Sequence, residues 1–361
     1  MEQNRNVNDV RQNLESILFN YYIKYTSLQN LVPASFQSLN NRANTIDIYI
    51  DVFDMLKGIY GRQIYANKQY VIVSSVINLV AHMRHYFAKM WNVRTRIYLV
   101  YANDSSSNHK QFYAGFGDDS YKSTLNYAEN NKLIISQLEM VKILVAYIYD
   151  VYFVEKSTVF PVFVYDNIIK NTSEIPAIIL TKSTYAYQIP ALLPNTAIFR
   201  PKKYKGEDLS YSVIKPNVLQ KYYNGLTRPK TLEYMNNIDS SNLALLMALT
   251  GNSQCKMNSV VNASVAIRIV SEAIKSGKML NYHMSDTAYI YSNIPELSKY
   301  VNMQSFICRF NACDLVYQHL LYTQMPESID RTWEVNFYDP GTVQDINNKY
   351  FADNPLDLNS L

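Results

Sequence analysis

The pattern of apolar and polar positions predicts an α/β protein in the first two thirds of the chain. Segments TIDIYIDVF (45–53), TRIYLVYA (95–102) and IPAIILTKS (175–183) are rich in β-branched and aromatic residues, which is typical of buried strands. Between them, residues 69–90 and 131–150 carry apolar positions at helical spacing. Strands that alternate with helices in this way predict a parallel sheet covered by helices.

The pattern changes near residue 230, beyond which short polar turns separate amphipathic segments. Helices are predicted there at 240–250, 259–276, 294–300 and 303–322. We therefore divide the chain into a helical N-terminal arm with a helix at 8–32, an α/β core, a helical region and an extended C-terminal tail, at 1–40, 41–230, 231–325 and 326–361. The arm and the tail are the predicted interface segments.

Composition narrows the classes of partner. The net charge of +4 comes from 34 basic and 30 acidic residues. This small excess does not predict a strongly basic surface for binding nucleic acid. Tyrosine occurs 32 times and glycine nine times, which fits either drift in an AT-rich genome or a protein that works through interfaces.

The three cysteines (Cys255, Cys308, Cys313) lack CxxC spacing and are expected to be reduced and unpaired. The uncharged run Tyr70–Met83 is too short and polar to span a bilayer, so we expect no membrane partner and a protein made in the cytoplasm.

Several segments resemble, in order, the flap endonuclease and 5′–3′ exonuclease family of the PIN-like superfamily. They are IYIDVF, INLVAHMRHYF, TRIYLVYAND, AIILTKSTYAYQIPALLPNTAIFRPKK and LLMALTGNSQCKMNSVVNASVAIRIV, which together cover roughly residues 45–325. Gln188 and Ile189 stand at the family's Gln-Leu pair. Leu249, Thr250, Gly251, Asn258 and Ala266 match the start of the helix–three-turn–helix that clamps DNA. The resemblance implies a PIN-like parallel-sheet core followed by a helical region, with residues 103–130 in the place of the helical arch.

The chemistry of that family needs a cluster of carboxylates that holds two divalent cations. Asp51 is a vestigial candidate for one carboxylate of this cluster. Asp104 and Asp166 are further vestigial candidates. Residues 181–185 stand where other carboxylates belong, and Asn252 replaces the carboxylate after Gly251. We therefore expect no catalytic residue, no metal and no other cofactor.

The DNA clamp of the family is also altered. Its hairpin glycines let backbone amides approach phosphates, whereas this chain has no glycine between Gly251 and Gly277. Val260, Val261 and Val265 fit helix and core packing better than contact with a DNA backbone. Nucleic-acid binding is therefore expected to be weak or absent.

Three local features have two interpretations each. His82 and His85 are a zinc-ligand pair or, as we favour, ordinary histidines on a helix. Asp47, Asp51 and Asp54 are a catalytic cluster or caps of the following helix, and we favour capping. RPKKYKG (200–206) is a phosphate contact or, as we favour, a solvated hairpin tip.

Two functions from different classes remain. The first is a catalytically inactive nuclease fold used as a structural component, a homo-oligomeric ring in the tail or collar of a phage virion, in contact with other virion proteins. The composition resembles that of virion proteins of crAss-like tailed bacteriophages, made in the cytoplasm of the bacterial host. The alternative is a metal-dependent 5′-nuclease or flap-DNA-binding protein with a rearranged site at Asp51, Asp104 and Asp166, assisted by Asp118 and Asp119. An inactive protein that still binds DNA lies between them.

Overall fold

The computed structural model describes the central sheet and the helices around it. The described residues are 45–52, 92–102, 150–156, 159–171, 175–201 without 182 and 194, 211–214, 238–251 without 239, 257–277, 287–324 and 331–333, with single helical residues between 80 and 88 and between 138 and 145. Several predicted features lie outside these residues: the helix at 8–32, the excursion at 103–130, the end of the tail, Asp54, Asp104, Asp118, Asp119, His82, His85, Asn252 and Cys255.

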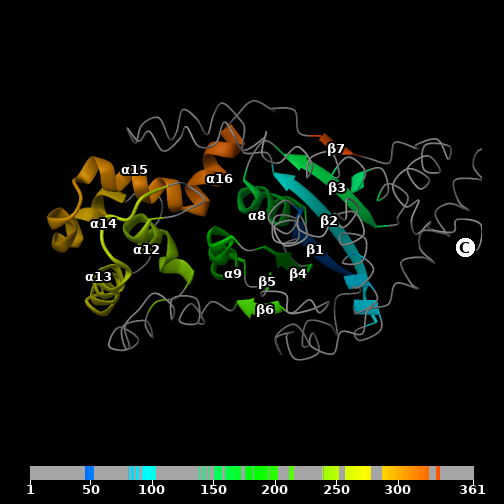
Figure 1. Ribbon diagram of the computed structural model, residues 1–361, viewed down its shortest axis with the longest axis horizontal. Coiled ribbons are helices and arrows are strands. Elements are labelled where there is room, and N and C mark those ends of the chain that lie inside the picture. Colours follow the sequence, from blue (N-terminus) through cyan, green and yellow to red (C-terminus); the bar gives the residue numbers. More distant parts are fainter. Residues whose placement is uncertain are drawn as a thin grey trace, which may run out of the picture.

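A seven-stranded sheet forms the core, with the strand order β6-β5-β4-β1-β2-β3-β7 (Figure 1). The strands are β1 Thr45–Asp51, β2 Arg94–Ala102, β3 Val151–Lys156, β4 Ala177–Leu180, β5 Thr196–Pro201, β6 Tyr211–Ile214 and β7 Arg331–Trp333. Neighbouring strands from β5 through β4, β1 and β2 to β3 are parallel, and β6 and β7 add antiparallel edges. The predicted fold class, a parallel α/β sheet followed by a helical region, is confirmed.

The strands predicted from apolar runs lie at the centre of this sheet. Every residue of β1 from Ile46 to Asp51 is buried, as is all of β4, because strands inside a parallel sheet are paired on both edges and covered on both faces. The hairpin interpretation of residues 200–206 agrees with the antiparallel pairing of β5 with β6. Residues 202–206 themselves lie outside the described part of the chain.

Three elements of the core differ from the sequence-based prediction. The strand β3 was not predicted, because it follows the preceding helix without a glycine or proline signal; Asp150 makes the turn with φ +58. Residues 160–171, to which the sequence analysis assigned no element, form the helix α8 (Phe160–Asn171). The strand β7 lies within the segment predicted as an extended tail, but it is added to the sheet edge beside β3.

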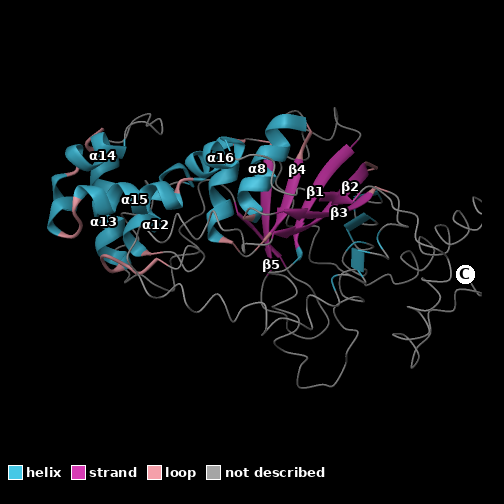
Figure 2. Cartoon of the chain, turned by 90° about the horizontal axis from the view of Figure 1, so that it is seen from above, coloured by secondary structure: helices cyan, strands magenta, loops and turns pink. Residues whose placement is uncertain are grey.

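The second unit is helical and follows β6. Its elements are the short 3₁₀ helix η6 Ser240–Asn242, α12 Leu243–Thr250, α13 Ala263–Lys275, α14 Thr287–Asn293, the 3₁₀ helix η8 Pro295–Lys299, α15 Met303–Cys313 and α16 Leu315–Gln324. Helix α14 was not predicted, and the single helix predicted at 303–322 is two helices separated by Asp314. Figure 2 shows α16 between the group α12 to α15 and the sheet with α8.

One hydrophobic core joins the sheet to the helical unit. Buried side chains from β1 (Tyr49), β4 (Ile179), α12 (Leu245), α13 (Ile267) and α15 (Phe306) belong to the same cluster. Cys313 is buried and Cys308 is half-buried, and the structure shows no disulfide at either residue within the described part of the chain. Within the part of the chain that the structure describes, no helix has the length and apolar character needed to cross a membrane.

Candidate functional site

The carboxyl ends of the parallel strands are the first place to look for a site, because ligands of open α/β sheets bind there. The central strand β1 ends at Asp51, and the neighbouring strand β4 is followed directly by Thr181. The pairing of Ile50 with Leu180 puts Asp51 and Thr181 next to each other on the same face. Asp51 is 6% exposed and Thr181 is fully buried.

The Asp51 carboxylate is hydrogen-bonded to a hydroxyl at this position. Thr181 donates from Oγ1 to the Asp51 Oδ2 at 3.2 Å, and the same oxygen accepts from the Ser183 backbone N at 3.0 Å. The Ser183 amide thereby orients the hydroxyl so that its proton points to the carboxylate. The sequence did not indicate this contact between two strand ends, and the capping role of Asp51 stays a prediction.

Among the described residues, the other strand ends bring no second acid next to Asp51. Its partner on β2 is Val100, which is buried and apolar. Glu155 on β3 pairs with Tyr101, one residue farther along, so its side chain lies on the opposite face of the sheet from Val100. Among the described residues, no three side chains of His, Cys, Asp or Glu form a group that would hold a metal ion.

Asp166 lies on the helix α8 and not at the end of a strand. Its Oδ1 accepts from Lys170 Nζ and from His319 Nε2 of α16, both at 2.9 Å, and its side chain is 9% exposed. Tyr165 packs edge-on against the His319 ring with ring centroids 5.1 Å apart. Asp166 therefore joins α8 to α16, and the described residues do not place it in a metal-binding group with Asp51.

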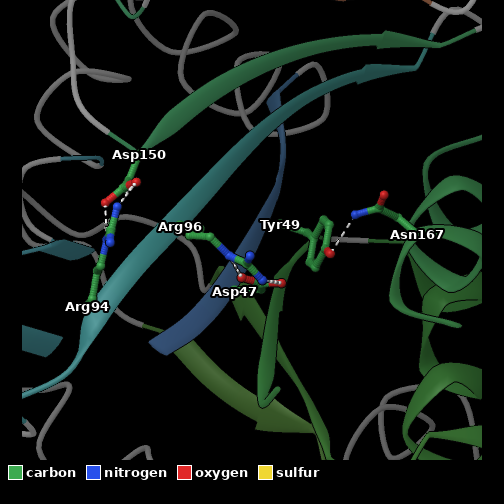
Figure 3. A network of polar contacts seen from close by, with 6 residues as sticks. All are labelled: Asp47, Tyr49, Arg94, Arg96, Asp150 and Asn167. Carbon is green, nitrogen blue, oxygen red and sulfur yellow. Dashed lines mark hydrogen bonds and ion pairs between the residues drawn. The ribbon is translucent and has the colours of Figure 1, made fainter. Parts of the chain in front are cut away.

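Asp47 forms an ion pair inside the sheet, and the capping interpretation of this residue is wrong. It lies in the middle of β1, fully buried, and accepts from Arg96 Nε at 2.6 Å and from Arg96 Nη2 at 2.8 Å. No local sequence pattern indicates this partner, because Arg96 lies on a different strand, 49 residues along the chain. A similar two-bond pair joins Arg94 to Asp150, at 2.5 and 2.7 Å, nearer to solvent (Figure 3).

Next to the ion pair, three tyrosines stack across the central strands. The ring centroids of Tyr49 and Tyr98 lie 4.8 Å apart, and those of Tyr98 and Tyr152 lie 5.2 Å apart. Asn167 of α8 donates to the Tyr49 hydroxyl at 2.8 Å, which Figure 3 shows beside the Asp47 pair. Burial raises the pKa of Tyr49 well above its ordinary range, and burial with the nearby Asp47 charge raises the pKa of Tyr98 to about 12. The Tyr49 and Tyr98 phenols are therefore neutral packing groups at physiological pH.

In the segment that resembles the DNA clamp, three backbone amides form hydrogen bonds within the protein. Gly251 ends α12 with φ +80, and the chain returns so that Val260 N and Val261 N both donate to Leu249 O. Val265 N donates to the side chain of Asn262, the cap of α13, at 2.9 Å. These three amides are therefore satisfied within the protein, and the three valine side chains pack on or in the core, as predicted.

Arg309 holds the same turn from the side of α15. Its Nε donates to Ala248 O at 2.8 Å, and its Nη2 donates to Asn258 O. Burial lowers the pKa of this guanidinium from its ordinary value, although it remains a cation. The sequence analysis did not single out Arg309. Its partners are backbone carbonyls distant in sequence, so no local pattern indicates the contact.

Comparison with known proteins gives structural neighbours but no sequence relative. No protein-family model matches the chain, and no curated protein sequence is similar to it. A T5 protein crystallised with metal ions has a TM-score of 0.48 at 11% identity, over 76% of this chain and 91% of the other. The bacteriophage T5 flap endonuclease, as a pseudo-enzyme–product complex with DNA and metal ions, has a TM-score of 0.46 at 13% identity, over 76% and 90%. The T5 5′-exonuclease with bound zinc ions has a TM-score of 0.46 at 11% identity, over 76% and 91%.

Proposed function

We propose that this protein has a flap-endonuclease-like fold without phosphodiester-cleaving activity and that it works through the surfaces it presents to other proteins. The observation that supports this most strongly is the Asp51–Thr181 hydrogen bond at the carboxyl edge of the sheet. The described ends of β1, β2 and β4 provide one carboxylate, that of Asp51, and the residue beside it is the hydroxyl donor Thr181.

The physical argument rests on what two-metal hydrolysis requires. Two divalent cations held about 4 Å apart need several carboxylates that bridge and flank them, because Mg²⁺ exchanges its water ligands only for well-placed oxygens. A threonine hydroxyl carries no charge, and Thr181 already gives its proton to Asp51 and accepts from Ser183. This pair of residues stabilises the sheet edge and does not form a cation site.

The segment after α12 supports the same conclusion for DNA. Binding to a phosphate backbone needs free backbone amides or exposed cations. The amides of Val260, Val261 and Val265 are bonded internally, and the Arg309 guanidinium binds two carbonyls. We therefore propose weak nucleic-acid binding at most.

We further propose that the protein has a structural role in a phage virion. In this role it forms a homo-oligomeric ring that contacts other virion proteins. This role is supported by the tyrosine-rich, glycine-poor composition, because tyrosine supplies large contact area with few rotatable bonds. Native mass spectrometry of the purified chain tests it directly. A closed oligomer of the 41.8 kDa chain is the expected result, and a monomer at all concentrations would argue against the ring.

The alternative function is a metal-dependent 5′-nuclease, and the observation in its favour is Asp51 itself, buried at the end of the central strand. Cleavage of 5′-flap and single-stranded DNA is to be measured with Mg²⁺ and Mn²⁺ for the wild-type chain and for Asp51→Asn. We expect no cleavage that depends on Asp51. Metal-dependent cleavage that disappears in Asp51→Asn would establish the nuclease in place of our proposal.

DNA binding without cleavage is tested separately by filter binding at several salt concentrations. Binding that weakens steeply with salt would indicate contacts to phosphates and would support an inactive DNA-binding protein. Our proposal predicts no such salt-dependent binding.

A further inference from the structure

One residue, Asp314, separates α15 from α16, and only one of its two backbone angles departs from a helix. Its φ of −83 lies in the helical range, whereas its ψ of 115 is extended. Helical hydrogen bonds reach it from both sides, because Asp314 N donates to Phe310 O at 2.8 Å and Gln318 N donates to Asp314 O at 3.0 Å. Rotation of this single ψ angle to a helical value would therefore join α15 and α16 into one helix.

The sequence of residues 303–324 favours that single helix. It contains neither glycine nor proline, and its apolar positions continue at helical spacing through Asp314. The extended ψ prevents the amides of residues 315–317 from bonding to the carbonyls of residues 311–313, as they would in a continuous helix. These backbone groups need other partners, because leaving them unpaired inside the protein is unfavourable. The break is thus a departure from the local preference of the chain.

Two side chains of the segment itself replace part of the lost bonding. The Asp314 carboxylate accepts from the backbone amides of Val316 and Tyr317, as the cap of α16. The Gln318 Nε2 donates to Asn311 O at 2.9 Å. These contacts satisfy two amides that follow the break and one carbonyl that precedes it.

The side chain of Gln188, from the α/β core, holds one further group on each side of the break. Its Oε1 accepts from Leu315 N at 3.2 Å, and its Nε2 donates to Cys313 O at 2.9 Å. Gln188 is 5% exposed and ends the 3₁₀ helix η3 (Thr184–Gln188), where its Nε2 also donates to Tyr185 O at 3.3 Å. Because both the donor and the acceptor of this buried amide are used, its orientation is fixed.

We propose that residues 303–324 are a helix that the α/β core holds in a bent state through Gln188, and that without these two contacts the segment straightens and α16 leaves α8. In the bent state α16 lies against α8, where His319 contacts Asp166 and Leu315 is fully buried (Figure 2). Helix α12 contacts η3 independently of the junction. Straightening therefore moves α16 away from the core and leaves the rest of the helical unit attached.

The distance between two spin labels in the full chain tests this. The labels are placed at Gln304 of α15 and Gln324 of α16, both exposed, through a ketone-bearing amino acid, so that the cysteines stay unmodified. Double electron–electron resonance then gives the distance between the labels. A straight helix would separate the two positions by about 30 Å, at a rise of about 1.5 Å per residue, and the bend shortens this distance. We expect the wild type to give the shorter distance alone.

Gln188→Met keeps the length of the side chain and leaves Leu315 N and Cys313 O buried without their partner in the bent state. We expect it to add a population near about 30 Å that the wild type lacks. Gln318→Met is the matched control, because it removes a contact made within the segment, and it should keep the wild-type distance. A wild-type distance in Gln188→Met, or equal straightening in Gln318→Met, would overturn the proposal.

Gln188→Glu gives a second test within one folded variant. A protonated carboxyl group can accept from Leu315 N and donate to Cys313 O as the amide does, whereas a carboxylate cannot donate. We therefore expect the wild-type distance at pH 5 and the longer population at pH 9 in this variant, with the same short distance at both pH values in the wild type. The same distance at both pH values in Gln188→Glu would contradict the role of Gln188.

Discussion

Thr181 donates a hydrogen bond from its Oγ1 to the Asp51 Oδ2 at 3.2 Å, and this bond joins the ends of two neighbouring parallel strands at the centre of the sheet. Both side chains are buried, so the carboxylate is held by protein groups at the edge where α/β proteins bind ligands. The bond explains how a single buried acid is stabilised there. Each element of this account gives a measurable consequence.

Thr181→Val keeps the shape of the side chain and removes the donor to Asp51. We expect a loss of about 1–2 kcal/mol in the free energy of unfolding, because a buried charged acceptor loses a partner. Urea denaturation measures it. The matched control is Thr250→Val, whose hydroxyl bonds to Leu246 O within α12, and which should cost less than about 0.5 kcal/mol. Equal losses in the two variants would contradict the importance of the Asp51 contact.

Arg96→Met removes the guanidinium from the fully buried Asp47. The expected loss is about 2–3 kcal/mol, because the remaining carboxylate stays desolvated, although the partial exposure of Arg96 moderates the cost. Arg94→Met breaks a pair of the same two-bond geometry in which the arginine is 58% exposed, and it should cost less than about 1 kcal/mol. The interpretation fails if the Arg94 variant loses as much stability as the Arg96 variant.

Gly251→Ala tests the turn that follows α12. A Cβ there would lie 2.4 Å from Met257 O and 2.7 Å from Ser259 N, in a backbone with φ +80. We expect a loss of more than about 2 kcal/mol in thermal or urea unfolding, since both the left-handed conformation and the backbone contacts oppose a side chain. Gly277→Ala, with φ +67 in the exposed turn after α13, should cost about 1 kcal/mol. An alanine at 251 that is tolerated as well as one at 277 would show that the turn relaxes.

Ser271→Ala is expected to stabilise the protein by about 1 kcal/mol. Its hydroxyl is fully buried in α13 and has no hydrogen-bond partner among the described residues, and such a group costs free energy on folding. Differential scanning calorimetry should give a higher Tm. Ser276→Ala, an exposed serine that bonds to Ala273 O, is the control and should lower stability slightly. A Tm that falls in Ser271→Ala would mean that the hydroxyl has a partner.

The sequence predicted the centre of the fold because β1, β2 and β4 are continuous apolar runs, and burial on both faces of a parallel sheet requires such runs. It missed β3 because Asp150, and not glycine, makes the left-handed turn before that strand. It merged α15 and α16 because their helical pattern continues through Asp314. The break is stabilised by Gln188, which lies 125 residues from Cys313 in the chain.

The site was predictable only in part, for a similar reason. Asp51 was found because it ends an apolar strand, and the lack of acids near Thr181 was visible in the sequence. The role of Asp166 was not predictable, because its partner His319 belongs to a helix more than 150 residues away in the chain. The same is true of the contacts of Asp47 with Arg96 and of Arg309 with Ala248. Local patterns identify elements, whereas these pairings depend on the order of strands and helices in space.

Manganese binding shows whether Asp51 belongs to a metal site. Mn²⁺ is to be titrated into wild-type protein and into Asp51→Asn, and the bound ion followed by electron paramagnetic resonance together with calorimetry. We expect the two proteins to give the same weak, non-saturating response, because Asp51 is bonded to Thr181 and shares no metal-binding group with other described residues. Saturable binding of one or two ions that is lost in Asp51→Asn would show that a nuclease metal site is present and would contradict the account.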